Sequence, residues 1–276
     1  MSAIRHLRGR WFSGLMTVLV YFFLLGPIIA IALASLEGKS TYHFQFPPET
    51  FSLTWYASIP AKYLHALEVS VLVAAITACI STLIGCAAAI GIVRGGYRAN
   101  EAIQAFFNLP LHVPLVVSGV VFLQFYNQLA IISGVDFLGS LTGVVIAHVF
   151  VTIPYSIGSV GSVLTRANPR LEAAARTLGA SEWSVFRRVL LPILKPGLFA
   201  GFFYAFIVSF GDVPIAVFVA TGAFVTLPVE IFQTLRFDFD PAVLAISTLV
   251  VIFSVLLIIG TQKLVGFDLV LRSTRR

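Results

Sequence analysis

The sequence predicts an all-α integral membrane protein with about six transmembrane helices, and three observations lead to this fold class. Of the 276 residues, 58% are hydrophobic and only 11% are charged, whereas soluble domains carry about 25% charged residues. The apolar residues form blocks long enough for helices of roughly 20 residues to cross a bilayer. These blocks are continuous and lack the apolar–polar alternation of a membrane β-barrel.

We expect one transmembrane domain over residues 1–276. The first apolar block is longer than the apolar core of a signal peptide, which has about 7–15 residues, so we interpret it as a retained helix. The expected spans, all approximate, are residues 11–35, 66–93, 102–128, 138–164, 197–220 and 242–265.

A polar connection, residues 36–65, joins the first two spans. Its segment Phe51-Ser-Leu-Thr-Trp-Tyr56 carries aromatic side chains that can anchor a short helix at a membrane interface. The second span repeats small residues at every third or fourth position, which lets another helix approach closely. These small residues are Ala74, Ala78, Ser81, Gly85 and Ala89.

Prolines mark the interruptions expected in the later spans. Pro110 and Pro114 should kink or break the third span, because proline removes a helical hydrogen bond. Pro192 and Pro196 should end a helix in the preceding loop and restart the chain in the fifth span. Residues 221–240 are expected to form an outer loop before the sixth span.

Lys and Arg are distributed unequally over the two sides of this topology. Six spans place both termini on one side. The termini, with Lys263 counted at the C-terminal end, the 94–98 turn and the 166–196 loop hold fifteen of the 18 Lys and Arg residues. The other three are Lys39, Lys62 and Arg236. The positive-inside rule therefore predicts that both termini and the 166–196 loop are cytoplasmic. Because the net charge of +6 follows this topology, we expect no nucleic-acid partner.

The 166–196 loop is the longest polar stretch, and it carries the signals of two short helices. Asn168 is suited to cap the first helix, with Pro169 at its first position. Gly179 supplies the backbone freedom of a tight turn. Ser181 can then cap a second helix that leads toward the fifth span.

The residue types offer no enzymatic chemistry. The sequence has no Walker-type phosphate loop, no His-Glu-x-x-His motif and no cysteine pair at zinc spacing. Cys79 and Cys86 would lie about 10 Å apart on one helix, which is too far for a disulfide. We therefore expect that this chain binds no cofactor or metal, is not an enzyme and has no energy source of its own.

The spacing within the 166–196 loop resembles the Glu-Ala-Ala loop of bacterial binding-protein-dependent ABC importer permeases. The matching positions are Ala173, Ala174, Ala175, Gly179, Val189, Leu191 and Pro192. The glutamate of the motif falls on Ala173, whereas the nearest acid is Glu172, one residue earlier. Two readings of Glu172 stay open at this point: it takes over the role of the motif glutamate, or it does not.

The resemblance implies a transport subunit with separate partners. Two short helices turning at Gly179 would dock on a cytoplasmic dimer of ATP-binding subunits, which hold ATP with Mg, and Trp183 and Phe186 offer apolar anchors. A second permease subunit, homologous or identical, and an extracytoplasmic solute-binding protein would complete the assembly in the bacterial inner membrane. Arg187 and Arg188 have two open roles, pairing with acids or facing lipid headgroups.

Weaker matches elsewhere resemble the spermidine/putrescine-type permeases of this group. They are the 51–56 segment, Leu109-Pro110, Ser209-Phe-Gly-Asp212, Thr226-Leu-Pro228 and Asp240-Pro241. Two positions depart from that type: Gly211 replaces the first of two adjacent acids, and Leu244 replaces an asparagine. The resemblance implies polyamine import, with phosphonate, opine, ferric iron or thiamine as alternative substrates.

Asp212 is the acid that lies well inside an expected span. A charge in the bilayer costs at least about 2.5–3.5 kcal/mol on insertion scales, so the carboxylate should face the bundle interior or a water-filled path. It either lines the path of a cationic substrate or has a structural role with hydrogen bonds to a neighbouring helix. Tyr155, Tyr204 and Phe210 are further path candidates, because aromatic faces can hold an amine cation; packing is their alternative role.

Two other function classes fit the sequence less well. An ion-coupled secondary transporter would need coupling-ion sites, often on broken helices in two inverted halves, and the sequence has no evident internal repeat. An intramembrane enzyme would need paired catalytic groups at matching depth, and the spans offer none. The sequence therefore favours an ATP-driven importer subunit.

Overall fold

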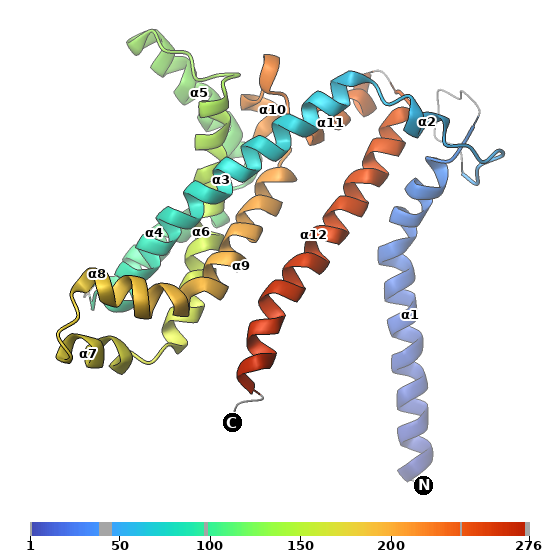
Figure 1. Cartoon of the computed structure of the whole chain (residues 1–276). Helices are drawn as coiled ribbons and strands as arrows, with labels where there is room; N and C mark the ends of the chain where they lie inside the picture. The colour runs from blue at the N-terminus through green and yellow to red at the C-terminus, as the bar shows by residue number, and fades with distance from the viewer. Residues whose placement is uncertain (1, 39–45, 97–98, 238, 274–276) are drawn as a thin grey trace. The chain divides into compact units, whose positions relative to one another are not determined.

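The structure, a computed structural model, describes residues 2–38, 46–96, 99–237 and 239–273. Within these ranges the regular elements are helices, accompanied by one isolated β-bridge between Glu37 and Phe51. The predicted all-α class is thus confirmed (Figure 1). Some basic residues of the charge asymmetry lie outside the described ranges, namely Lys39, Arg98, Arg275 and Arg276.

Six helices in the described part of the chain are long and apolar enough to cross a membrane, as predicted. Their apolar stretches begin and end close to the expected spans in four cases, while the third and fifth differ as described below. The stretches are Ser13–Ala34, Ala61–Arg94, Leu115–Ser133, Leu141–Arg166, Glu182–Phe210 and Ala242–Gly260. The helices that contain the first and last are α1 (Ser2–Ala34) and α12 (Ala242–Ser273).

Two compact units make up the chain, and the first consists of Met1–Leu64 and Ile231–Leu256. Its short helix α2 (Thr54–Ala57) lies where the aromatic 51–56 segment predicted one. The buried Glu37 fixes the loop before it, because its carboxylate accepts a 2.6 Å hydrogen bond from the Thr50 hydroxyl. This unit contributes no residue to the candidate sites named above.

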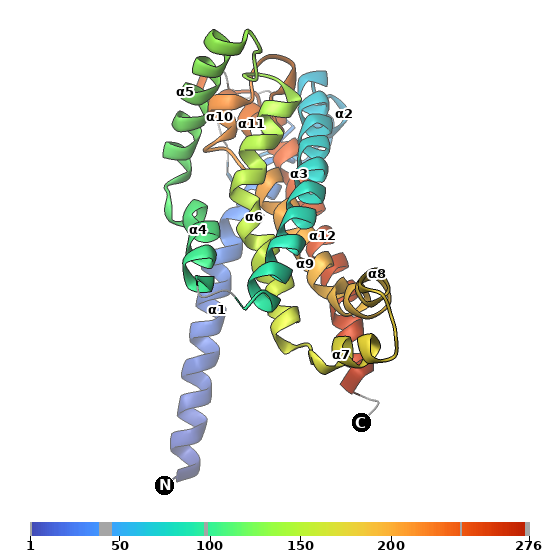
Figure 2. The ribbon, with the colours of Figure 1, turned by 90° about the vertical axis from the view of Figure 1, so that its left-hand side faces the viewer.

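The second unit consists of His65–Glu230 and Leu257–Arg276. Helices α6 (Leu141–Arg166) and α9 (Leu191–Phe210) pack along each other at its centre (Figure 2). Helix α3 (Ala61–Arg94) contacts α6 through a 2.7 Å hydrogen bond between the Ser81 and Thr152 hydroxyls. All the candidate site residues lie in this unit.

Small residues produce the close helix contacts, as their spacing in the second span predicted. Gly85 of α3 faces Ser156 of α6 so closely that an added Cβ would lie 2.6 Å from the serine Cβ. Gly201 of α9 also faces this serine: a Cβ added at Gly201 would lie 3.2 Å from the Cα of Ser156. Ser156 is therefore the point at which three helices of this unit meet.

The third span breaks between its prolines, as predicted. Helix α4 (Asn100–His112) ends before Pro114, and α5 (Leu115–Ser133) begins directly after it. The residue before a proline is disfavoured in the α region, and Val113 accordingly has an extended backbone with ψ 130°. Pro110 lies inside α4 without ending it. Of the two helices, α5 is long and apolar enough to cross the membrane, whereas α4 is not.

The expected boundaries of the fifth span are wrong at both ends. Pro192 and Pro196 do not interrupt the helix, because Pro192 sits in the first turn of α9, where a missing N–H is tolerated. At the other end α9 stops at Phe210 instead of continuing to Ala220, since Gly211 and Pro214 do not sustain a helix. The short helix α10 (Ala216–Val219) follows.

The expected outer loop at 221–240 is largely helical. It contains the short 3₁₀-helix η2 (Gly222–Phe224) and helix α11 (Leu227–Phe237). Buried Ser70 of α3 accepts the backbone N–H of Leu227 at 2.7 Å and so fixes the start of α11. The sequence prediction missed α11 because its Pro228 and charged residues suggested a loop.

Candidate functional site

The polar stretch before α9 folds into two short helices joined by a tight turn, here called the hairpin (residues 167–185). Helix α7 (Arg170–Thr177) and helix α8 (Glu182–Val185) flank Gly179, whose φ of +82° lies in the left-handed region. Glycine adopts this conformation without the strain that a Cβ would cause. The predicted turn residue is therefore confirmed as the turn.

The predicted cap of the second helix is present, whereas in the first helix the capping position falls on Pro169, one residue after Asn168, and no side chain caps it. The Asn168 side-chain oxygen accepts a 3.0 Å hydrogen bond from the Arg170 N–H, although α7 itself begins at Arg170. The Ser181 hydroxyl accepts the Ser184 N–H at the start of α8. These side chains satisfy backbone donors that have no partner within a first helical turn.

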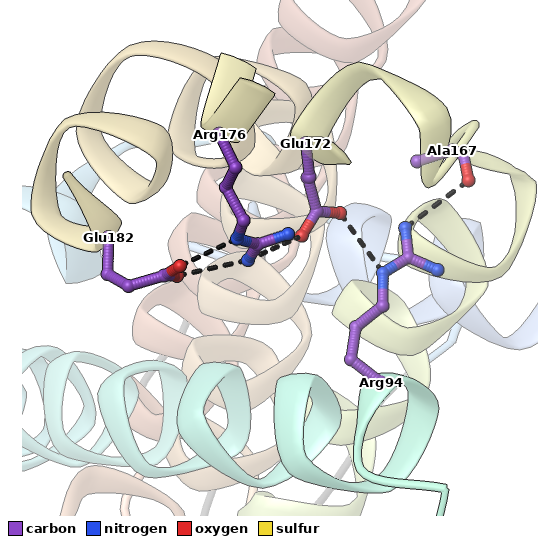
Figure 3. Close-up of polar contacts among 5 residues, drawn as sticks. All are labelled: Arg94, Ala167, Glu172, Arg176 and Glu182. Carbon is purple, nitrogen blue, oxygen red and sulfur yellow. Dashed lines mark hydrogen bonds and ion pairs between the residues drawn. The ribbon is translucent and has the colours of Figure 1, made fainter. Parts of the chain in front are cut away.

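Glu172 forms the centre of an ion-pair network at the root of the hairpin (Figure 3). One carboxylate oxygen accepts a 3.1 Å hydrogen bond from Nε of Arg94, the last residue of α3. The other lies 4.0 Å from the guanidinium of Arg176, one turn along α7. Arg94 also donates from Nη2 to the carbonyl of Ala167 at 3.3 Å.

The two ends of this network differ in solvent exposure. Glu172 is only 8% exposed, whereas the bidentate pair of Arg176 with Glu182, at 2.6 and 3.0 Å, lies on the surface. The hydrogen bond to Glu182 raises the pKa of Arg176 above its ordinary value, so this guanidinium stays charged. The two charges of a buried ion pair need each other, because removing one leaves the other buried without compensation; in an exposed pair water takes over this role.

Apolar side chains project from the free side of the hairpin. Leu178 beside the turn is 88% exposed and Trp183 is 67% exposed. The Trp183 ring stacks on Phe186, with centroids 5.6 Å apart and planes at 24°. Phe186 itself packs against a core cluster that includes Leu190 and Leu194. Trp183 is thus a rigidly supported aromatic surface.

A turn of π-helix, η1 (Phe186–Leu190), joins α8 to α9. The Leu191 N–H donates to the Phe186 carbonyl, five residues back, instead of four as in an α-helix. Such turns are rare and occur frequently at functional sites. The hairpin therefore continues into the membrane-spanning helix without an intervening loop.

The remaining motif positions divide between the surface and the interior. Ala173, Ala174 and Pro192 are exposed, whereas Ala175, Val189 and Leu191 are partly buried. The structure therefore brings the whole motif into one hairpin and its connection to α9.

Asp212 lies at the end of α9, where its carboxylate holds the chain break. Its Oδ1 accepts the backbone N–H groups of Ile215 and Ala216 at 3.0 and 2.9 Å, and the residue is 7% exposed. Nε2 of the buried His148 lies 3.7 Å from the same oxygen, and Nδ1 is 2.8 Å from the Ser209 hydroxyl. The hydrogen bonds to the backbone of the following turn are a sufficient structural reason for a buried carboxylate at this position.

The aromatic path candidates do not share one environment. Tyr155 on α6 and Tyr204 on α9 are exposed, Tyr204 by 57%. Phe210 is buried and stacks on Phe206, with centroids 5.9 Å apart. Their role in a substrate path stays a prediction.

Sequence reasoning missed Arg94 and Ser209 as partners. Arg94 was assigned only to the cytoplasmic charge count, and its contact with Glu172 joins positions 78 apart in the chain. A signal was nevertheless present, because a basic residue ends a span on the side where an acid begins the hairpin. The bond between His148 and Ser209 had no comparable signal.

Comparison with known proteins now places the chain. Residues 81–269 match the family described as binding-protein-dependent transport system inner membrane component. The chain belongs to this family. It is a multi-pass inner-membrane permease of an ABC import system, a transport component rather than an enzyme.

Curated relatives extend over most of this permease. PotC of Escherichia coli strain K12, a spermidine/putrescine transport system permease protein, is 26% identical over 256 residues, covering 92% of this chain and 94% of PotC. ModB of Mycobacterium tuberculosis strain H37Rv, a molybdenum transport system permease protein, is 33% identical over 204 residues, covering 71% of this chain and 77% of ModB.

A solved structure shares the fold of the permease. A chain of the bacterial alginate ABC transporter, determined in complex with an alginate pentasaccharide-bound periplasmic protein, matches with a TM-score of 0.70 at 16% identity. The match covers 94% of this chain and 95% of that chain. This likeness concerns the fold alone.

Proposed function

We propose that this permease couples ATP hydrolysis by a separate cytoplasmic dimer of subunits to the import of a polyamine. The observation that carries the proposal is the exposed Trp183 of the hairpin, whose ring stacks on Phe186, which in turn packs against the core. Partly exposed aromatic anchors on a rigid support are typical interface hot spots. ATP with Mg belongs to the partner subunits.

The orientation proposed for the permease places both termini and the hairpin in the cytoplasm. The asymmetry of Lys and Arg supports this orientation through the positive-inside rule. A second permease subunit, homologous or identical, completes the path, and a solute-binding protein delivers the substrate from outside. Tyr155, Tyr204 and Phe210 remain the proposed path residues together with Asp212.

Polyamine is the preferred substrate because the similarity to PotC covers almost the whole chain, including the outer 51–56 segment. Molybdenum import is a second candidate, since the identity to ModB is higher over a shorter part. Uptake of labelled spermidine by cells expressing the complete transporter, with putrescine and molybdate as competitors, separates the two. Competition by molybdate alone would reject the polyamine.

The docking role of the hairpin is tested by co-purification of the ATP-binding subunit with a tagged permease. Trp183→Ala removes the exposed anchor, and we expect the affinity for that subunit to fall at least about tenfold, as at interface hot spots. Ile132→Ala, at an even more exposed apolar position near the end of α5, is the control and should leave the complex intact. Equal recovery with both variants would contradict the docking role.

A further inference from the structure

The ion pair between Arg94 and Glu172 ties the hairpin to a helix that is distant in the chain. We propose that this pair is the joint through which movement of the hairpin is passed to α3, so that Glu172 acts on its own chain and not on the ATP-binding partner. The inference rests on the proposed function, because it concerns how the coupled movement enters the membrane. Glu172 is in this sense a positioning residue.

Among the described residues, three connections can be followed from the hairpin into the membrane-spanning helices. Two are covalent: α6 enters the hairpin at Ala167, and α8 continues through η1 into α9. The third is the guanidinium of Arg94, which contacts both the Ala167 carbonyl and the Glu172 carboxylate. Arg94 thereby spans the entry of the hairpin and attaches it to the end of α3.

Movement imposed on Arg94 reaches the core because α3 is firmly packed. Gly85 lets α3 contact the backbone of α6 at Ser156, and Ser81 adds a buried hydrogen bond to Thr152. Close-packed helices behave as rigid elements and do not absorb displacement. A displacement of the end of α3 is therefore carried along the helix instead of being lost at its end.

Burial explains why Glu172 serves α3 and not a partner. The carboxylate is enclosed, with Arg94 on one oxygen and Arg176 near the other. A partner cation would have to displace one of these arginines, which would leave a charge enclosed without compensation. The exposed neighbours Ala173 and Ala174 carry no acid that could substitute for Glu172.

The hairpin itself contains a matched control. Arg176 and Glu182 form an ion pair of the same chemistry, but both residues belong to the hairpin and are solvent-exposed. Glu182→Gln breaks this pair and removes neither partner of the Arg94–Glu172 hydrogen bond. Exposed pairs contribute little to stability, so its loss should also leave the hairpin folded.

The test uses the complete transporter, with the ATP-binding subunits, the second permease and the solute-binding protein, reconstituted in proteoliposomes. Substrate uptake and ATP hydrolysis are measured together for Arg94→Gln, Glu172→Gln, the double variant and Glu182→Gln. We expect the ratio of uptake to ATP hydrolysed to fall at least about fivefold in both single variants, the lower limit typical of coupling between sites. Glu182→Gln should stay near the wild-type ratio.

The double variant decides whether the two residues act as one joint. Residues that act through each other show non-additive losses, so Arg94→Gln/Glu172→Gln should be no worse than either single variant. A wild-type ratio in Arg94→Gln, or losses that add, would overturn the proposal. If Arg94→Gln kept the wild-type ratio while Glu172→Gln was defective, Glu172 would act on the ATP-binding partner instead of on α3.

Assembly is followed in the same preparations by co-purification of the ATP-binding subunit. If the single variants do not assemble, the swapped variant Arg94→Glu/Glu172→Arg takes their place: recovery of assembly and coupling supports the joint, and failure to recover rejects it. A wild-type complex without ATP-binding subunits would instead refute the proposed function, and the joint with it.

Discussion

At the scale of single residues, Asp212 shows how a buried charge just beyond the end of a span can be explained by the backbone next to it. Its carboxylate accepts two buried N–H groups at the start of α10. An unsatisfied buried donor costs about 1–3 kcal/mol. The acid therefore has a sufficient reason to lie there without contacting a substrate.

The role of Asp212 can be separated into hydrogen bonding and charge. Asp212→Ala removes both, and we expect it to lower the stability of the detergent-solubilised complex by about 1–3 kcal/mol. Asp212→Asn keeps an oxygen that can accept both N–H groups, so its unfolding midpoint should stay close to that of the wild type. Normal stability with lost uptake in Asp212→Asn would assign the charge to the substrate path after all.

The sequence allowed some of these residue roles to be predicted and not others. Gly179 and Ser181 act within a few residues of the chain, where turn and cap preferences are local. Arg94 and Glu172 depend on how α3 and α7 are brought together, which no local preference contains. The same holds for His148 and its bond to Ser209.

At the scale of helices, the contact of α3 with α6 depends on the absence of a side chain at Gly85. An added methyl group there would lie 2.6 Å from Ser156 Cβ and 3.1 Å from the Ile157 nitrogen. The backbone cannot rotate away as a side chain can. The two helices must therefore separate to accept it.

Two alanine substitutions on the same helix should consequently have opposite effects. We expect Gly85→Ala to destabilise the permease by about 1–3 kcal/mol, the usual effect of overpacking. Gly91→Ala meets no atom within 4 Å, and it should stabilise α3 by up to about 1 kcal/mol through helix propensity. Unfolding midpoints in detergent measure both. Equal midpoints for the two variants would show that the helices are not packed this closely.

Helix boundaries were predictable only where one local rule acted alone. The rule for the residue before a proline gave the break at Pro114 correctly. The same reasoning failed at Pro192, because η1 joins α8 to α9 ahead of the proline and lets the helix continue. The end of α9 at Phe210 was missed because the apolar residues continue beyond it, although the helical backbone stops there.

At the scale of the whole molecule, the proposed orientation in the membrane rests on where the basic residues lie. The all-α class and the six apolar helices followed from the composition and from the lengths of the apolar blocks. A chain that crosses a bilayer must satisfy its backbone hydrogen bonds internally, as a helix does. The orientation of these helices is a separate matter, and it depends on the charge asymmetry.

Cysteine labelling tests this orientation directly. In a Cys79→Ser/Cys86→Ser background, Leu178→Cys places a thiol at an exposed position next to the turn of the hairpin. We expect a membrane-impermeant maleimide to label it in inside-out vesicles but not in intact spheroplasts, with Phe51→Cys showing the reverse. Labelling of Leu178→Cys in intact spheroplasts would invert the topology and remove the coupling role of the hairpin.

The π-helical turn η1 also determines the direction in which Trp183 points. Each residue of an α-helix rotates the chain by about 100° about the helix axis, and η1 contains one residue more than an α-helical turn needs. Deleting one residue from Phe186–Leu190 would turn η1 into an α-helical turn and leave Trp183 facing about the same way, whereas deleting one residue from the regular part of α9 would rotate Trp183 by about 100° relative to the rest of that helix. The π-turn can therefore lose one residue without redirecting the exposed aromatic surface of the hairpin, which a regular helix could not do.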